Sequence, residues 1–173
     1  MGGRPGRDLV GRRPGGAAPP GPPLTTIAYR DGILAADSLA HEDGLRQGYI
    51  VKVGPTPDGG AWGLTGMAGH TALWRAWACG DRSADPPGFA EESDAILIEP
   101  DGRVRVWTEE KWEELEDTIY AWGSGTALAL GAMEHGATAE EAVACAIRRD
   151  MGSHGKICTV KIGALISQDI SPN

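Results

Sequence analysis

The sequence has no apolar run that approaches the ~18 residues of a membrane-spanning helix, and its first 23 residues lack the apolar core of a secretory signal. Cysteine is scarce: Cys79, Cys145 and Cys158 are an odd number, lie far apart and form no C-x-x-C pair. This usage excludes a disulfide framework and a cysteine zinc site, and it is typical of reduced thiols. We therefore expect a cytoplasmic protein with no membrane contact.

Positive charge is also scarce beyond the first 24 residues. That segment holds four arginines against one aspartate, a charge of +3, whereas the whole chain carries −8, which leaves −11 for residues 25–173. An acidic body of this kind argues against nucleic acid as a partner.

Several motifs of catalysis and cofactor binding are missing as well. The chain has no G-x-S-x-G, the elbow that presents a serine nucleophile, and no H-E-x-x-H, the pattern of a catalytic zinc site. It also lacks the P-loop and the G-x-G-x-x-G pattern that hold nucleotide phosphates. We therefore expect neither a cofactor nor a metal.

The first 24 residues consist mainly of proline, glycine and arginine. Such a composition cannot bury enough apolar surface to offset the entropy of ordering, so we predict a disordered leader over residues 1–24. It is a propeptide, a linker, or the result of a mis-assigned start, with Leu24 as an alternative start codon before the small Thr25. All three interpretations place an exposed junction before a single domain over residues 25–173.

The domain begins with a strand–turn–strand pattern over residues 24–37, in which Asp31-Gly32 is a strong hairpin signal. A second hairpin is predicted from alternating residues at 95–99 and 103–107. We also expect strands at 49–53, 61–67, 119–122 and within 156–166, a polar loop at 41–44, one helical turn within 108–117, and helices at 68–79, 126–135 and 138–149, the last with a Thr138–Glu141 capping box. Antiparallel hairpins with segregated helices predict an α+β fold.

Thr25, at the point where regular structure begins, is the first candidate for chemistry. Once such a residue is N-terminal, its hydroxyl is a nucleophile and its own α-amine, with a pKa near 8, is a base. Both groups belong to one residue, so no distant histidine is needed. The alternative is an ordinary strand threonine, since β-branched residues are common in strands.

Lys52 is one of four lysines and lies inside an Ile-Val-Lys-Val run. A buried ammonium needs a partner, and Asp37, at the end of the second predicted strand, is a natural one. Together they would place a positive field beside the Thr25 oxygen and favour its alkoxide. The alternative is an edge-strand lysine that faces water.

Residues at the junctions of elements complete the candidate set. Gly66 could offer its backbone N–H to an oxyanion, or it could form a plain tight turn. His70, at a helix start, is better explained as a capping or surface residue than as a base. Hydroxyl and carboxyl side chains at helix ends usually act as caps, and this alternative applies to Ser124, Asp150 and Ser153.

Taken in order, these residues resemble the proteasome β-subunits and the bacterial HslV-type peptidase. The resemblance covers about residues 25–163 and is strongest to small proteasome-like proteins encoded by phages and prophages. It rests on Thr25-Thr26-Ile27, Ala35-Ala36-Asp37, Lys52, the 65–72 segment Thr-Gly-Met-Ala-Gly-His-Thr-Ala, Gly123-Ser124-Gly125 and Asp150-x-x-Ser153.

The resemblance implies a four-layer αββα sandwich of the N-terminal nucleophile (Ntn) hydrolase class. The implied reaction is attack on a peptide carbonyl, formation of an ester on the threonine, and hydrolysis of that ester. The implied roles are Thr25 as nucleophile and base, Asp37 and Lys52 as its charge pair, Gly66 as oxyanion donor, and Ser124, Asp150 and Ser153 as support around the amine and its water.

Three departures from the family pattern stand out. The first hairpin is short, residues 79–94 leave room only for a linker where larger members carry a second long helix that helps to stack rings, and Thr25 is not N-terminal as written. We expect an autoprocessing threonine peptidase that forms a homo-oligomer and acts on peptide or unfolded protein, with an ATP-dependent unfoldase as partner by analogy only. Two alternatives stay open: a non-catalytic structural or assembly subunit, and an Ntn amidohydrolase that acts on a small amide.

Overall fold

The computed structural model describes residues 24–42, 45–89 and 93–163. The described elements form two antiparallel sheets, a separate two-stranded hairpin and three helices. The first sheet has the order β10 (Ile119–Gly123), β1 (Thr26–Arg30), β2 (Ile33–Ala36) and β11 (Cys158–Lys161). The second has the order β5 (Val53–Pro55), β6 (Ala61–Leu64), β7 (Ala95–Ile98), β8 (Val104–Thr108) and β9 (Lys111–Leu115). The hairpin is β3 (Leu39–Glu42) with β4 (Leu45–Tyr49), and the helices are α1 (Ala68–Ala78), α2 (Thr126–Glu134) and α3 (Ala139–Ile147).

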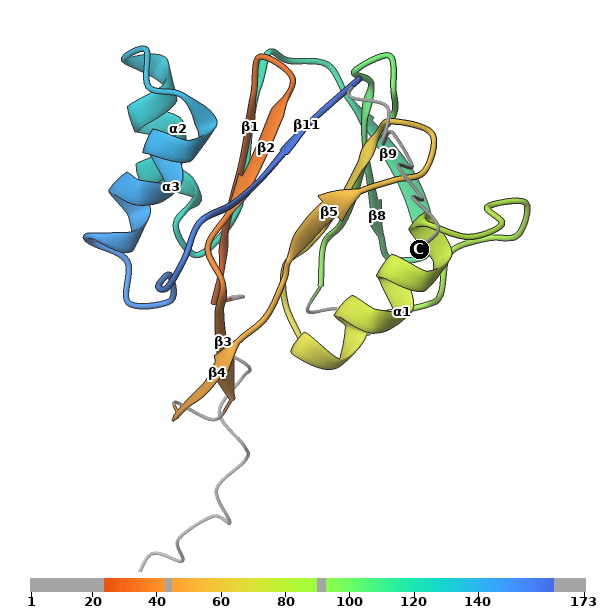
Figure 1. Cartoon of the computed structure of the whole chain (residues 1–173), viewed down its shortest axis with the longest axis horizontal. Helices are drawn as coiled ribbons and strands as arrows, with labels where there is room; N and C mark the ends of the chain where they lie inside the picture. Colours follow the sequence, from red (N-terminus) through yellow and green to blue (C-terminus); the bar gives the residue numbers. More distant parts are fainter. Residues whose placement is uncertain (1–23, 43–44, 90–92, 164–173) are drawn as a thin grey trace, which may run out of the picture.

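The sheets and helices are stacked in layers. In Figure 1, α2 and α3 cover the outer face of the first sheet, the two sheets face each other, and α1 covers the outer face of the second. Three apolar clusters match the three interfaces: one between the sheets, one between the first sheet and α2 with α3, and one between the second sheet and α1. The fold is therefore α+β with antiparallel sheets, and its layers are compatible with the predicted αββα sandwich.

The alternation of side chains along β1 determines what each face of the first sheet presents. Ile27 and Tyr29 pack in the cluster between the sheets, whereas Ala28 packs in the cluster under α2 and α3. Successive side chains of a strand point to opposite faces. Thr25 and Thr26, at the start of β1, therefore project in opposite directions, Thr25 toward the second sheet and Thr26 toward the helices.

Several sequence predictions are confirmed. The first hairpin turns at Asp31 and Gly32, whose φ angles of 50° and 74° are both left-handed, as a two-residue hairpin turn requires. The second hairpin, the helix that begins at residue 68 and the Thr138–Glu141 capping box are also present. Within the described parts of 79–94 no helix follows α1, in agreement with the predicted linker.

The predicted helical turn within 108–117 is wrong, because β9 occupies residues 111–115. Glu109 and Glu110, with φ angles of 48° and 59°, form the turn that reverses the chain from β8. Trp112 of β9 then lies opposite Trp107, with ring centroids 5.4 Å apart. This cross-strand aromatic pair outweighs the acidic, helix-favouring composition of the segment.

Other predicted boundaries shift. The prediction of one strand over 49–53 is wrong, because β4 ends at Tyr49 and β5 begins only at Val53. The predicted loop at 41–44 is also wrong in its first half, because residues 41–42 belong to β3. The remaining loop residues 43–44, the leader residues 1–23 and the predicted strand end at 164–166 lie outside the described residues. None of the helices in the described segments is long and apolar enough to cross a membrane.

Candidate active site

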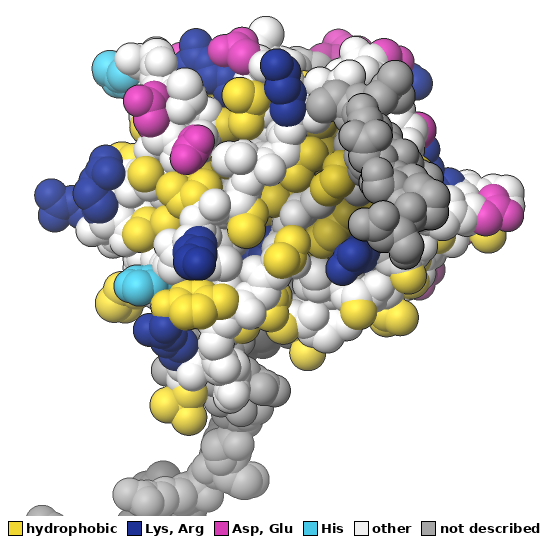
Figure 2. All heavy atoms as spheres, viewed as in Figure 1, with side chains coloured by type: hydrophobic (Ala, Val, Ile, Leu, Met, Phe, Trp, Pro, Cys, Tyr) yellow, Lys and Arg dark blue, Asp and Glu magenta, His cyan; other side chains and the backbone are white. Residues whose placement is uncertain are grey.

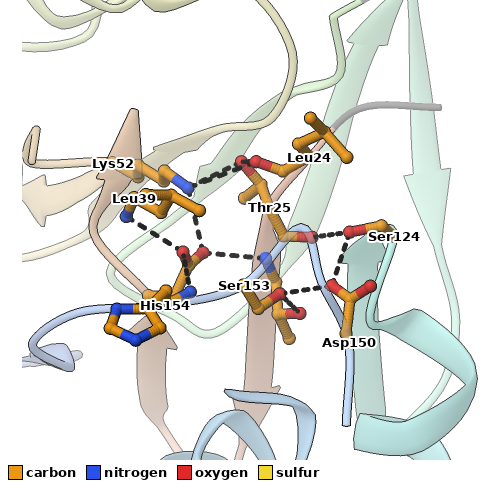
Figure 3. A network of polar contacts seen from close by, with 10 residues as sticks. Leu24, Thr25, Leu39, Lys52, Ser124, Asp150, Ser153 and His154 are labelled. Carbon is orange, nitrogen blue, oxygen red and sulfur yellow. Dashed lines mark hydrogen bonds and ion pairs between the residues drawn. The ribbon is translucent and has the colours of Figure 1, made fainter. Parts of the chain in front are cut away.

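Thr25 lies where the chain enters β1, and its side chain is only 2% exposed. Its Oγ1 accepts a hydrogen bond from Lys52 Nζ at 2.8 Å and donates one to the Leu24 carbonyl oxygen at 2.6 Å. Figure 3 shows the hydroxyl between the ammonium and the preceding peptide. A buried positive charge this close to the hydroxyl oxygen stabilises negative charge that develops on that oxygen.

Asp37 explains why a lysine ammonium is buried here. Lys52 is 3% exposed and its Nζ lies 2.9 Å from Asp37 Oδ1, in a carboxylate with no exposed surface. Asp37 also accepts three backbone N–H groups, from Thr26 at 2.9 Å, Leu39 at 3.0 Å and His154 at 3.1 Å. Four donors on two oxygens hold the ionised carboxylate, and that charge in turn holds the ammonium.

Two opposing effects act on the pKa of Lys52, and the effect of burial is the larger. Burial disfavours its charged form and lowers the pKa of Lys52 below the ordinary value of 10.5. The Asp37 carboxylate opposes this effect, and Asp150 adds a smaller contribution in the same direction as Asp37. The result is an ammonium that gives up its proton more readily than a surface lysine.

A second group of hydroxyls surrounds Asp150 on the other side of Thr25. Ser124 Oγ and Ser153 Oγ both donate to Asp150 Oδ2, each at 2.6 Å. Ser124 Oγ also lies 3.4 Å from the Thr25 carbonyl oxygen, and Ser153 Oγ lies 2.6 Å from Thr26 Oγ1. Asp150 therefore holds two hydroxyls that contact the first two residues of the domain (Figure 3).

The glycines on either side of Ser124 make this approach possible. Gly123 has a φ of +91°, and a Cβ there would lie 2.1 Å from the Thr25 carbonyl oxygen. A Cβ at Gly125 would lie 1.9 Å from Thr26 Oγ1. Any side chain at either position would push the strand end away, so the Gly-Ser-Gly pattern is required by the site itself.

Gly66 lies two residues after the end of β6 and has a φ of 100°. Leu64, the last residue of β6, donates its N–H to the Lys52 carbonyl at 3.0 Å. Among the described residues the Gly66 N–H has no hydrogen-bond partner. His70 is engaged elsewhere, because its Nδ1 lies 3.0 Å from Ser93 Oγ and its ring packs on Phe89.

The structure joins most of the predicted residues in one closed ring of contacts. Thr26 and the backbone donors of Leu39 and His154 also belong to the site, although they were not among the residues predicted from the sequence. The alternation of side chains next to Thr25 could have indicated Thr26, whereas nothing in the sequence indicates the two backbone donors. The predicted residues in the ring are Thr25, Asp37, Lys52, Ser124, Asp150 and Ser153, and Thr26 closes the ring between Asp37 and Ser153.

Across residues 24–42, 45–89 and 93–163, no group of three His, Cys, Asp or Glu side chains could hold a metal ion.

Comparison with known proteins gives a likeness of fold. No protein-family model matches the chain, and no curated protein matches its sequence. Among solved structures, Thiobacillus denitrificans BPH aligns with a TM-score of 0.57 and 19% identity over 80% of this chain and 97% of BPH. BPH in complex with epoxomicin aligns with a TM-score of 0.58 and 19% identity over 80% of this chain and 98% of that chain. The chain therefore shares the fold of BPH.

Proposed function

We propose that this chain is an N-terminal-threonine hydrolase of the Ntn class that cleaves peptide bonds once residues 1–24 are removed. The single observation that carries the proposal is the 2.8 Å hydrogen bond from the buried Lys52 ammonium to the Thr25 hydroxyl, with Asp37 behind the lysine. A strand threonine has no need of such a pair, and a buried ion pair is often no more stabilising than apolar residues of similar volume, so a role in the chemistry explains the pair better than stability does. The whole arrangement fits activation of a nucleophile.

In the proposed first step, Thr25 Oγ1 attacks the carbonyl carbon of the substrate. The hydroxyl proton passes to the free α-amine of Thr25, and the Lys52 ammonium stabilises the oxygen as its charge develops. The Gly66 N–H, which has no partner within the described parts of the chain, is the proposed donor to the substrate oxygen, which becomes negative in the tetrahedral intermediate. The intermediate then collapses: the α-ammonium of Thr25 gives its proton to the leaving amine as the C–N bond breaks, and the acyl group remains as an ester on Thr25.

The second step hydrolyses the ester. A water molecule attacks the ester carbonyl with the α-amine again as base, and the proton passes to Thr25 Oγ1 as the acyl–oxygen bond breaks and the acid product leaves. The proposed task of Asp150 with its two serine hydroxyls is to keep the amine and this water in position. Its carboxylate, already fixed by two 2.6 Å hydrogen bonds, needs no rearrangement during the reaction.

The mechanism requires that the peptide bond between Leu24 and Thr25 be cut. In the uncut chain the Thr25 nitrogen belongs to an amide, which is no base, and the Leu24 carbonyl accepts the hydrogen bond of the nucleophile. We therefore propose that the full-length chain is an inactive precursor. This same contact also favours the second candidate, a structural or assembly subunit that keeps its leader and never frees Thr25.

The surroundings of the site favour peptide or unfolded protein over a small polar amide. Seven large apolar side chains are exposed among the described residues, and four of these adjoin Thr25, Lys52, Gly66 or Asp150 in the chain. These four are Leu24, Val51, Met67 and Met151. Apolar side chains are also spread over the face drawn in Figure 2, with basic side chains standing singly between them. We propose a homo-oligomeric cytoplasmic peptidase, with an unfoldase partner by analogy with the resembling family alone.

The test uses three versions of the protein: the full chain, a mature form that begins at Thr25 after removal of a fusion partner, and the mature form with Thr25→Ala. We expect the mature form to hydrolyse a library of fluorogenic peptides and to gain the mass of one epoxomicin, the molecule bound to the BPH relative. The full chain should do neither until it is cut. Thr25→Ala should lower turnover by at least about 10³-fold, the scale seen when a nucleophile is removed.

Intact mass and circular dichroism make the outcomes distinct. A folded mature form that cleaves no peptide and gains no epoxomicin mass would favour the structural subunit. Activity that survives Thr25→Ala would refute the assignment of the nucleophile.

A further inference from the structure

We propose that Thr26 is a positioning residue whose hydroxyl keeps Ser153 aligned with Asp150 beside the N-terminal threonine. This inference rests on the proposed function. Thr26 is fully buried, and it faces α2 and α3 because it alternates with Thr25 along the start of β1. Two adjacent threonines would thus serve the two halves of one site, Thr25 on the lysine side and Thr26 on the aspartate side.

The geometry around the Thr26 hydroxyl is specific for a small polar group. Thr26 Oγ1 lies 2.6 Å from Ser153 Oγ. Position 125 is a glycine, and a Cβ added there would lie 1.9 Å from Thr26 Oγ1. The same Cβ would also lie 2.8 Å from Ala146 Cβ of α3, so position 125 must stay without a side chain both for this helix contact and for the Thr26 hydroxyl.

Counting protons gives the direction of the hydrogen bonds. The Ser153 hydroxyl has a single proton, and it is donated to the Asp150 carboxylate at 2.6 Å, because an ionised carboxylate can only accept. Ser153 Oγ must therefore accept the proton of Thr26 Oγ1. The chain runs from Thr26 to Ser153 to Asp150, which leaves one lone pair of Ser153 Oγ free to accept from a donor at the Thr25 terminus.

The backbone of Thr26 ties this chain to the charge pair. Its N–H donates to Asp37 Oδ1 at 2.9 Å, and its carbonyl accepts the Asp37 N–H at 3.1 Å. Thr26 is thus in direct contact with Asp37 and Ser153 and is covalently bound to Thr25. A displacement of its side chain would move the groups on both sides of the nucleophile.

The test compares two near-isosteric substitutions in the mature form that begins at Thr25. Thr26→Ser keeps the hydroxyl and loses the methyl group, whereas Thr26→Val keeps the shape and loses the hydroxyl. If the hydroxyl positions Ser153, Thr26→Ser should keep kcat within about threefold and Thr26→Val should lower it about tenfold with little change in KM, the scale of one hydrogen bond. Thr159→Val, at an exposed position of β11, is the matched control and should leave kcat unchanged.

The melting temperatures of the two Thr26 variants should not follow the order of their kcat values. Thr26→Val preserves the packed volume, so its melting temperature should be at least as high as that of Thr26→Ser, which leaves a small cavity. Activity that follows this packing order, with Val equal to or better than Ser, would overturn the positioning role while leaving the proposed function intact. A folded mature wild type with no activity would instead overturn the proposed function and the positioning role with it.

Discussion

Replacement of Lys52 by methionine tests the central feature of the site, because it keeps the apolar stem and removes only the ammonium. The ammonium lies 2.8 Å from the Thr25 hydroxyl and 2.9 Å from Asp37. Loss of one donor that stabilises a developing oxyanion lowers kcat by about 10²–10³-fold. We therefore expect the mature Lys52→Met enzyme to lose activity on this scale.

The same substitution also affects stability. Removing one partner of a buried pair costs about 3–5 kcal/mol, because the other charge is left buried without compensation. Asp37 keeps its three backbone N–H donors, so we expect a value near the lower end, about 3 kcal/mol in the free energy of unfolding. Urea unfolding at neutral pH would measure it, and turnover must be determined under conditions where the variant is folded.

The pH dependence of Lys52 provides an independent signature. Its pKa in the folded protein is lowered from 10.5, mainly by burial, so the ammonium loses its proton at lower pH than a surface lysine does. Activity that needs the ammonium should fall along an alkaline limb below pH 10.5, and Lys52→Met should lack this limb. Stability responds in the opposite sense: the folded state binds this proton less well than the unfolded chain, so the unfavourable contribution is full below the lowered pKa and fades as pH rises from there to 10.5.

Lys161→Met, at an exposed position of β11, is the matched control for Lys52→Met and should change neither turnover nor stability measurably. A Lys52→Met enzyme that is folded and retains more than about a tenth of wild-type kcat/KM would show that the ammonium does not stabilise the oxyanion, since one such donor is expected to contribute more than that.

Three further substitutions test neighbouring features. Asp37→Asn is nearly isosteric but should destabilise the fold by about 3 kcal/mol in urea unfolding, because an amide NH₂ would face N–H donors that now meet a carboxylate; a neutral effect would contradict the four-donor arrangement. Gly123→Ala should abolish both folding at 37 °C and activity, since its Cβ would lie 2.1 Å from the Thr25 carbonyl oxygen, and a normal melting curve would contradict this. Thr138→Ala removes the cap of α3 and should lower stability by about 1 kcal/mol while kcat is unchanged, so a loss of kcat in the folded variant would argue against a purely local role.

Much of the fold follows from local patterns. The Asp31-Gly32 turn and the Thr138–Glu141 box are defined by a few adjacent residues, so they could be predicted from the sequence. The β9 strand could not, because its conformation depends on a tryptophan pair between two strands.

The site, like the fold, has features that could be predicted from the sequence and features that depend on the folded chain. Thr25, Lys52 and Asp37 could be named as partners from residue type and position. Lys52 lies in the connection before β5 and not in a strand, and it is buried. Both features depend on tertiary contacts such as the hydrogen bond from Leu64, which local sequence does not indicate. The backbone donors to Asp37 come from residues 26, 39 and 154, which only the folded topology brings together.

The unequal distribution of aromatic residues between the layers has a spectroscopic consequence. Five of the six tryptophans belong to the cluster between the second sheet and α1, whereas the layer under α2 and α3 is built mainly from alanine, with valine and methionine. The sixth, Trp122, lies between the sheets. Intrinsic fluorescence will therefore report almost entirely on the α1 side of the molecule. A fluorescence melt that precedes loss of the far-ultraviolet helix signal would show that side opening first, while the first sheet, where β1 begins after Thr25, is still folded.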